Sequence, residues 1–253
     1  MNSIGVSLIV FACVFSGSLL GFFLREVLPG HHLNADAKEA VKLGAGLVAT
    51  LTALVLGLLI STAKGSFDAT NTMVTQSGAK FLMMDGVLAN YGPEARGVRV
   101  LLKNLLRNRI AKAWPEASAK LPEADLPRKT VKFEEIQKAL RDLVPQNDLQ
   151  RSLQAKALEI SDEMSEIRWL LFEQLQTSLP SIFLGMLIFW STVLFICFGL
   201  LAPRNGTLIV VFFVCAISVA GAIFLILEMG KPLSGTMKIS SAPMVKTFGR
   251  LGK

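Results

Sequence analysis

Few side chains in this sequence have the types and spacing that catalysis or metal binding requires. The two histidines, His31 and His32, are adjacent and cannot form the i, i+4 pair of a zinc-binding helix. No nucleophile elbow, phosphate loop or zinc-protease motif occurs in the 253 residues. Cys13, Cys197 and Cys215 lie in uncharged stretches, where a thiol behaves as a small apolar group. We therefore expect no catalytic residues, no metal ligands, no cofactor and no enzymatic activity.

The absence of charge from long stretches predicts the class of protein. The chain is 52% hydrophobic and 18% charged, and its mean hydropathy is +0.51. A helix rises about 1.5 Å per residue, so about 20 uncharged residues can cross a hydrocarbon core roughly 30 Å thick. Four stretches of that length predict an integral protein of the lipid bilayer; they are 4–24, 43–63, 174–203 and 205–227. None holds an ionisable residue at depth, which disfavours a proton relay and leaves a passive pore possible.

Small and weakly polar residues follow one stripe of the second apolar stretch. At 100° per residue they fall within a sector of about 80°. The stripe consists of Gly46, Thr50, Ala53, Gly57, Ser61, Lys64 and Asp68. A leucine stripe lies beside it and consists of Leu47, Leu51, Leu54 and Leu58.

Two explanations of the small-residue stripe remain open. Gly, Ala, Ser and Thr allow membrane helices to approach closely, as we also expect of Gly17 and Gly21 in the first stretch and of Ser181 and Gly185 in the third. Alternatively, the stripe lines an aqueous path, and Lys64 at its cytosolic mouth favours anions.

Four spans place both chain termini and the long middle segment on one face of the membrane. Near the span ends that face has six Lys or Arg residues and the other has four, which favours cytoplasmic termini in an inner membrane. The predicted fold is all-α, with a cytosolic helical bundle inserted between transmembrane helices 2 and 3. Its divisions are helices 1 and 2 (1–63), the cytosolic domain (64–178), helices 3 and 4 (179–227) and a cytosolic tail (228–253).

Helical periodicity continues through the middle segment, without strand patterning. The expected helices are 68–89, ended by Tyr91-Gly92-Pro93, then 94–114, 131–144, and one from 147 into the third span; 112–128 is expected to be a proline-containing loop. Although the net charge is +7, basic residues alternate with acidic ones, so we expect no nucleic-acid binding.

Three groups of residues, in order along the chain, resemble the signatures of a family of bacterial membrane proteins described as bestrophin-like. They are 54–63 with Ser66-Phe67-Asp68; Trp190, Phe198-Gly199-Leu200 and 202–205; and 224–228, 232–235 and 239–243. Gly230 stands where that family's pattern has an aspartate, so no role is carried over for an acidic pair with Glu228.

The resemblance implies kinship with bestrophins, which are pentameric anion channels with four spans per subunit and a pore lined by the second helix. We therefore expect a homo-oligomeric channel, pentameric in form, that passes small anions. The pore-lining candidates are the seven residues of the small-residue stripe. The alternative is a non-conducting membrane scaffold or sensor whose cytosolic helices bind a protein partner; an intramembrane enzyme is disfavoured by the lack of a nucleophile–base pair.

Overall fold

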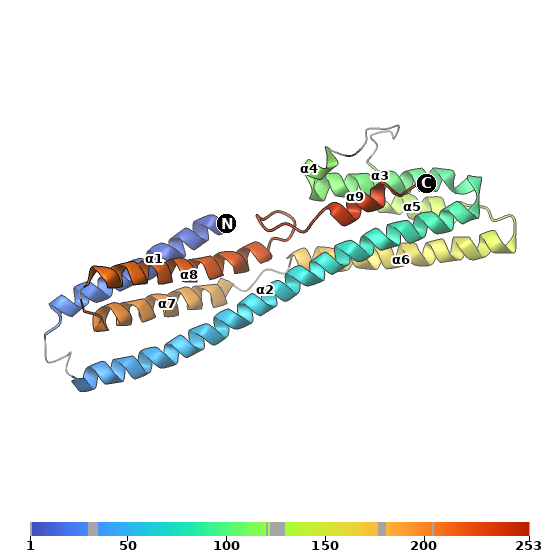
Figure 1. Cartoon of the computed structure of the whole chain (residues 1–253). Helices are drawn as coiled ribbons and strands as arrows, with labels where there is room; N and C mark the ends of the chain where they lie inside the picture. The colour runs from blue at the N-terminus through green and yellow to red at the C-terminus, as the bar shows by residue number, and fades with distance from the viewer. Residues whose placement is uncertain are drawn as a thin grey trace. The chain divides into compact units, whose positions relative to one another are not determined.

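The protein is built from α-helices, and none of the residues that the structure describes forms a strand. The computed structural model describes residues 2–29, 35–119, 121, 130–176, 181–203 and 205–252 (Figure 1). Outside these residues lie His31, His32, Arg204 and, in the proline-containing segment, residues 120 and 122–128. The chain divides into two compact units: an apolar unit of Met1–Phe67 with Ser178–Gly230, and a polar unit of Asp68–Thr177 with Lys231–Lys253.

Four of the described helices are long and apolar enough to cross a membrane. They are α1 (Ser3–Val27), α2 (Ala35–Tyr91), α7 (Ser181–Leu201) and α8 (Gly206–Met229). Helix α2 contributes to both units and has 57 residues. It begins eight residues before the apolar run, because Ala35, Lys38 and Glu39 are strong helix formers. The charges of Lys38 and Glu39 do not interrupt a helix.

Close backbone packing holds the apolar unit together. Helix α1 lies against α7 and α8, as Figure 1 shows. A Cβ atom added at Gly21 would lie 2.2 Å from the carbonyl oxygen of Ile196, and one added at Gly199 would lie 2.3 Å from that of Ser18. The predicted packing role of Gly21 is therefore confirmed. Buried Val10, Val14 and Ala216 continue the contact along the helices.

The expected packing role of Gly185 is wrong within this chain. A Cβ atom there would meet no heavy atom of the described residues within 4 Å, and Gly185 is exposed. Gly199, in the last turn of α7, contacts α1 instead. The pattern small-x-x-x-small marks a face that can approach another helix, but the partner determines which such face is used.

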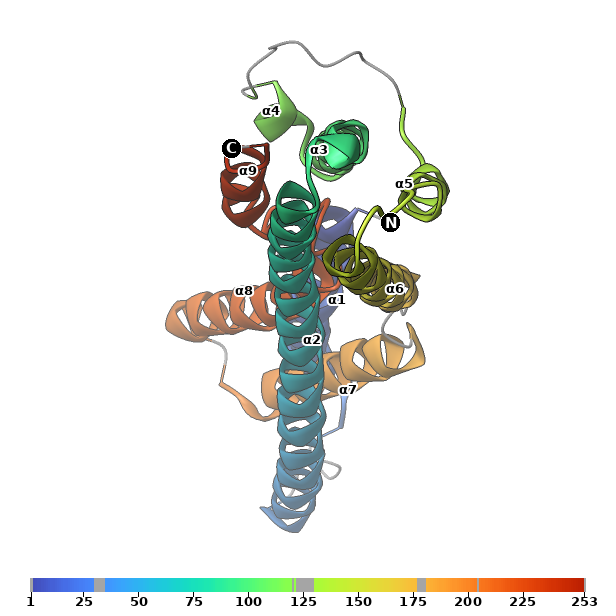
Figure 2. The same ribbon diagram turned by 90° about the vertical axis from the view of Figure 1, so that its right-hand side faces the viewer.

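The polar unit contains the last part of α2 together with shorter helices (Figure 2). These are η2 (Pro93–Ala95), α3 (Arg96–Ala113), α4 (Pro115–Ser118), α5 (Phe133–Arg141), α6 (Asp148–Gln176) and α9 (Ala242–Phe248). As predicted, α2 ends at Tyr91, because Gly92 has φ 126° and Pro93 follows. The expected loop at 112–128 is corrected at its start, where Pro115 begins one helical turn.

Candidate functional site

One face of α2 packs inside the apolar unit. Ala45 is buried in the cluster formed with α1, α7 and α8, and Val48 and Ala49 pack against it. Further along the helix, Leu59 and Ala63 are buried with partners from α7 and α8, namely Leu187, Ile226 and Met229. These α2 residues recur at helical spacing, so a single face of the helix is occupied by the chain's own core.

A second side of α2, away from this packed face, is not covered by the described part of the chain. All seven residues of the small-residue stripe are exposed: Gly46, Thr50, Ala53, Gly57, Ser61, Lys64 and Asp68. A Cβ atom added at Gly46 or Gly57 would meet no heavy atom of the described residues within 4 Å. Close packing between helices of this one chain therefore does not explain these two glycines. Their role as pore-lining residues stays a prediction.

The leucine stripe is also on this uncovered face. Leu54 is 66% exposed and Leu58 is 64% exposed, although both lie in the middle of the apolar run. We call this side of α2, with its small-residue and leucine stripes, the open face. A face that is half leucine and half Gly, Ala, Ser or Thr is unlike a uniformly lipid-facing one, and it fits contact with further helices or with water.

Several threonine hydroxyl groups on α2 donate to carbonyl oxygens of their own helix. Thr50 donates its hydroxyl proton to the carbonyl oxygen of Gly46 at 2.9 Å, and Thr62 donates to that of Leu58 at 2.9 Å. Each hydroxyl oxygen therefore presents lone pairs rather than a proton to its surroundings. The open face is weakly polar and carries no fixed charge between residues 43 and 63.

Lysines bracket this uncharged length. Lys42 and Lys64 are both exposed and stand 22 residues apart, which is about 33 Å along the helix and about 40° around it. The spacing matches the thickness of a hydrocarbon core. The pore-lining candidates chosen from the sequence include Lys64 but not Lys42, which precedes the apolar stretch that begins at residue 43.

Charge pairs outside the apolar unit stabilise the polar unit. Arg99 donates from Nε and Nη2 to the two carboxylate oxygens of Asp85, at 2.7 and 3.0 Å, and the backbone N–H of Gly252 donates to the same carboxylate at 3.0 Å. The hydrogen bond to Asp85 raises the pKa of Arg99. This pairing fastens the end of the chain to α2 and α3.

Among the described arginines, Arg109 is the one with a buried side-chain nitrogen that has no hydrogen-bond partner. Its guanidinium stacks on the rings of Phe81 and Phe133, with Cζ 5.3 and 5.8 Å from the ring centroids, and donates to the Ser77 hydroxyl at 3.3 Å. Its Nη2 is buried and has no hydrogen-bond partner among the described residues. Burial, with the nearby charge of Arg168, lowers the pKa of Arg109 to about 10. Nothing in the sequence pattern distinguishes this arginine from its exposed neighbours.

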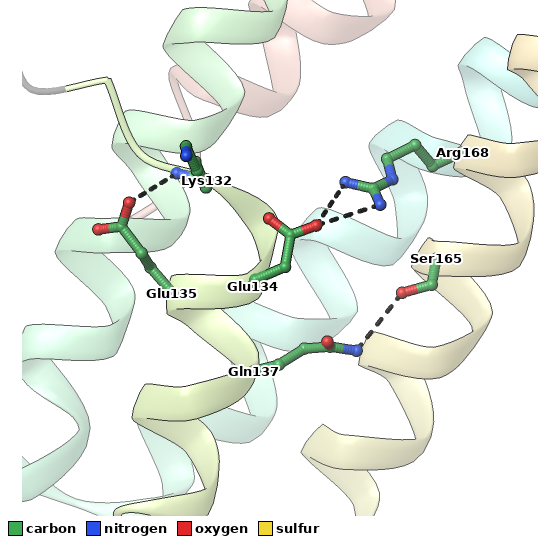
Figure 3. A network of polar contacts seen from close by, with 6 residues as sticks. All are labelled: Lys132, Glu134, Glu135, Gln137, Ser165 and Arg168. Atoms are coloured by element: carbon green, nitrogen blue, oxygen red, sulfur yellow. Dashed lines mark hydrogen bonds and ion pairs between the residues drawn. The ribbon is translucent and has the colours of Figure 1, made fainter.

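A network of polar contacts joins α5 to α6. Both terminal nitrogens of Arg168 donate to Oε1 of Glu134, at 3.2 and 3.3 Å, and Gln137 contacts Ser165 at 3.5 Å (Figure 3). The pKa of Glu134 is lowered mainly by a hydrogen bond from its own backbone N–H, and further by the hydrogen bond and charge of Arg168. The polar groups of this network pair with one another. Among the described residues, no group of three or more His, Cys, Asp or Glu could hold a metal ion.

Comparison with known families identifies the chain. Residues 12–244 match the family model of the Bestrophin-like domain, so the protein belongs to the bestrophin-like family. Together with the four apolar helices, this membership makes it a membrane protein. No curated protein and no solved structure matches the chain.

Proposed function

We propose that this member of the bestrophin-like family assembles into a homo-oligomeric channel, pentameric in form, that passes small anions through a pore bordered by α2. The observation that supports the proposal is the open face of α2, which no described part of the same chain covers. In a ring of subunits that face is available to neighbouring copies and to a central path. The proposed permeating species are small inorganic anions.

Ring geometry favours five subunits over four. Helices about 9.5 Å apart in a ring of five have their axes about 8 Å from the centre, and side chains extend about 5.5 Å from each axis. A radius of about 2.5 Å remains, compared with 1.4 Å for a water molecule. The same spacing in a ring of four leaves about 1 Å, which water cannot pass.

The packed face of α2 also indicates which residues point toward the axis. In a ring, the α1, α7 and α8 core of each subunit lies outside its α2, so the axis lies opposite the face that holds Ala45 and Leu59. At 100° per residue, Thr50, Leu54 and Ser61 lie within about 40° of that direction. Gly46 and Ala53 lie about 75–95° from it, where a neighbouring α2 would approach.

The lysines at the two ends of the open face supply the proposed anion preference. At 100° per residue Lys64 has the same direction as Gly46, and Lys42 lies about 40° further from the axis, so neither lysine lines the path itself. Five copies of each would instead place long basic side chains around the two mouths of an uncharged path, where they raise the local anion concentration. The proposed orientation in a bacterial inner membrane has both termini and the polar unit in the cytoplasm. Lys64 would then lie at the cytoplasmic end of the path and Lys42 at the opposite end.

Flux measurements test the activity. Purified protein in liposomes is expected to conduct chloride in preference to potassium, and Lys42→Glu with Lys64→Glu is expected to reduce or invert that preference. Lys156→Glu makes the same charge change on the exposed surface of α6 and serves as the control. Silent membranes across several anions and cations, at protein levels that show folded oligomers, would contradict the proposal.

Thiol labelling tests the direction of the open face. In a protein with its three native cysteines replaced, Thr50→Cys and Leu54→Cys are expected to react with a membrane-impermeant thiol reagent that alters the current. Leu59→Cys, in the packed face, is the unreactive control. If Ala53→Cys reacts while Thr50→Cys is protected, the axis lies on the Ala53 side of α2, which contradicts this geometry.

A second candidate function, a membrane scaffold or sensor that binds a protein partner, draws on a different observation. Val144 and Leu149, at the connection between α5 and α6, are 71% and 66% exposed. Exposed apolar side chains in a polar unit favour a binding surface. Full-length protein carrying Val144→Ser and Leu149→Ser should then lose a partner that the unchanged protein retains, while any conductance stays unaltered.

A further inference from the structure

The last two turns of α6 carry large apolar side chains that the described part of the chain does not bury. Trp169 is 61% exposed and Phe172 is 56% exposed, and Leu170 and Leu175 are also exposed. The rings of Trp169 and Phe172 meet edge to face, with centroids 6.1 Å apart. We call these four residues the α6 apolar end. Four large apolar residues within seven positions are unusual on a surface that contacts only water.

The same helix is conventionally amphipathic before this point. Ala157, Ile160 and Met164 are buried in the polar unit, at the spacing of one helical face. After Arg168 the exposed apolar residues no longer keep to one face, because Trp169 and Leu170 are separated by about 100°. The helix therefore extends beyond the bundle that it helps to form, and its end needs a different environment.

The covalent chain limits how far this end can be from the membrane. Four residues, 177–180, join Gln176 to Ser181, the first residue of α7, which is apolar enough to span a bilayer. Even a fully extended chain covers at most about 3.6 Å per residue, so Gln176 lies within about 18 Å of the start of that span. No charged residue occurs from 174 to 203. The α6 apolar end is thus adjacent in the chain to a membrane-spanning helix.

The chemistry of this end matches the bilayer interface. Tryptophan and other aromatic rings concentrate at the boundary between headgroups and hydrocarbon, where an apolar ring and a polar edge are both accommodated. Arg168 precedes the apolar end: its guanidinium lies over the Trp169 ring, 5.3 Å from the centroid, and is held by Glu134 (Figure 3). The cation is thereby held between Glu134 of α5 and the face of the Trp169 ring. Glu173 is the one charged residue between Trp169 and Leu175, and it is exposed.

We propose that Trp169, Leu170, Phe172 and Leu175 insert into the interfacial layer of the lipid bilayer and anchor the end of α6 there. This anchor attaches the polar unit to the membrane surface in addition to its covalent connections. The surface involves a lipid partner rather than an ion path, so it does not depend on whether the protein conducts.

Tryptophan fluorescence in vesicles tests the proposal. The sequence has three tryptophans, and Trp114→Phe with Trp190→Phe leaves Trp169 as the single emitter. In full-length protein reconstituted in phosphatidylcholine vesicles, lipids brominated near the headgroup are expected to quench Trp169 at least about twofold more than aqueous acrylamide does. A protein that retains only Trp114, whose Nε1 donates to the carbonyl oxygen of Ile239 at 2.8 Å in the polar unit, should not respond to brominated lipid.

Each other outcome would overturn the proposal. Strong quenching of Trp169 by acrylamide alone would place it in water, and protection from both quenchers would place it against a second copy of the chain or another protein. If the double variant does not fold, the difference in lipid quenching between the unchanged protein and Trp169→Phe gives the same measurement. A difference of zero there would equally exclude an interfacial anchor.

Discussion

Replacing Gly21 by alanine would place a methyl group inside the backbone of α7. The added Cβ would lie 2.2 Å from the carbonyl oxygen of Ile196, 2.8 Å from the amide nitrogen of Leu200 and 2.9 Å from the Cα atom of Gly199. All three are backbone atoms, so no side-chain rotation can relieve the contact. An ordinary contact requires at least 3.4 Å, and α1 must therefore move away from α7 by roughly 1 Å.

The expected cost of this movement follows from the contacts that it weakens. A gap of 0.5–1 Å forfeits about a quarter to a half of each dispersion contact, and overpacked sites typically lose about 1–3 kcal/mol. Because the clash here is between two backbones, we expect Gly21→Ala to lower the free energy of unfolding by about 3 kcal/mol. That change corresponds to an increase of about 150-fold in the unfolding equilibrium constant.

Matched controls exist on both helices. A Cβ atom at Gly5 of α1 or Gly185 of α7 would meet no described heavy atom within 4 Å, so alanine there should be neutral or stabilise by up to about 1 kcal/mol through helix propensity. The assay is reversible unfolding of the purified protein in mixed micelles, followed by circular dichroism. Equal stability of Gly21→Ala and Gly5→Ala would refute the close approach of α1 and α7.

Three further predictions concern the polar unit, each read as a change in unfolding free energy. Asp85→Asn should destabilise by about 2–4 kcal/mol, because it weakens a largely buried ion pair, whereas Asp148→Asn, in an exposed pair, should change stability by less than about 0.5 kcal/mol. Arg109→Met should be neutral or stabilising by about 1 kcal/mol, since an apolar chain of similar length replaces a buried guanidinium nitrogen without a partner; a loss above about 2 kcal/mol would mean that the charge is needed. Gly92→Ala should destabilise by about 1–2 kcal/mol because φ is 126°, while Gly97→Ala in α3 should not.

The sequence predicted helix ends where local chemistry determines them. Tyr91-Gly92-Pro93 ends α2 because a positive φ and a missing amide are properties of those residues alone. The start of α2 could not be predicted as closely, because hydropathy marks where a helix enters an apolar environment and not where its hydrogen bonding begins. Ala35 therefore precedes the apolar run by eight residues.

Features that depend on a partner could not be predicted in the same way. Gly21 and Gly185 both belong to small-x-x-x-small patterns, yet among the described residues a Cβ atom at Gly21 would meet another helix and one at Gly185 would not. Likewise, the pattern of α2 revealed a small-residue stripe but not that its glycines would lie uncovered. Arg109 is buried because Phe81 and Phe133 from two other elements enclose it, and no spacing along α3 indicates that arrangement.

The contact between Gly21 and Gly199 has a consequence for biosynthesis. The two glycines are 178 residues apart in the chain, and a ribosome adds about 5–20 residues per second, so α1 waits about 9–36 s in the bilayer before α7 is made. During that interval the face of α1 that carries Gly21 has no α7 to pack against. A nascent chain stalled before α7 would therefore leave this close-packing face of α1 exposed to whatever surrounds it.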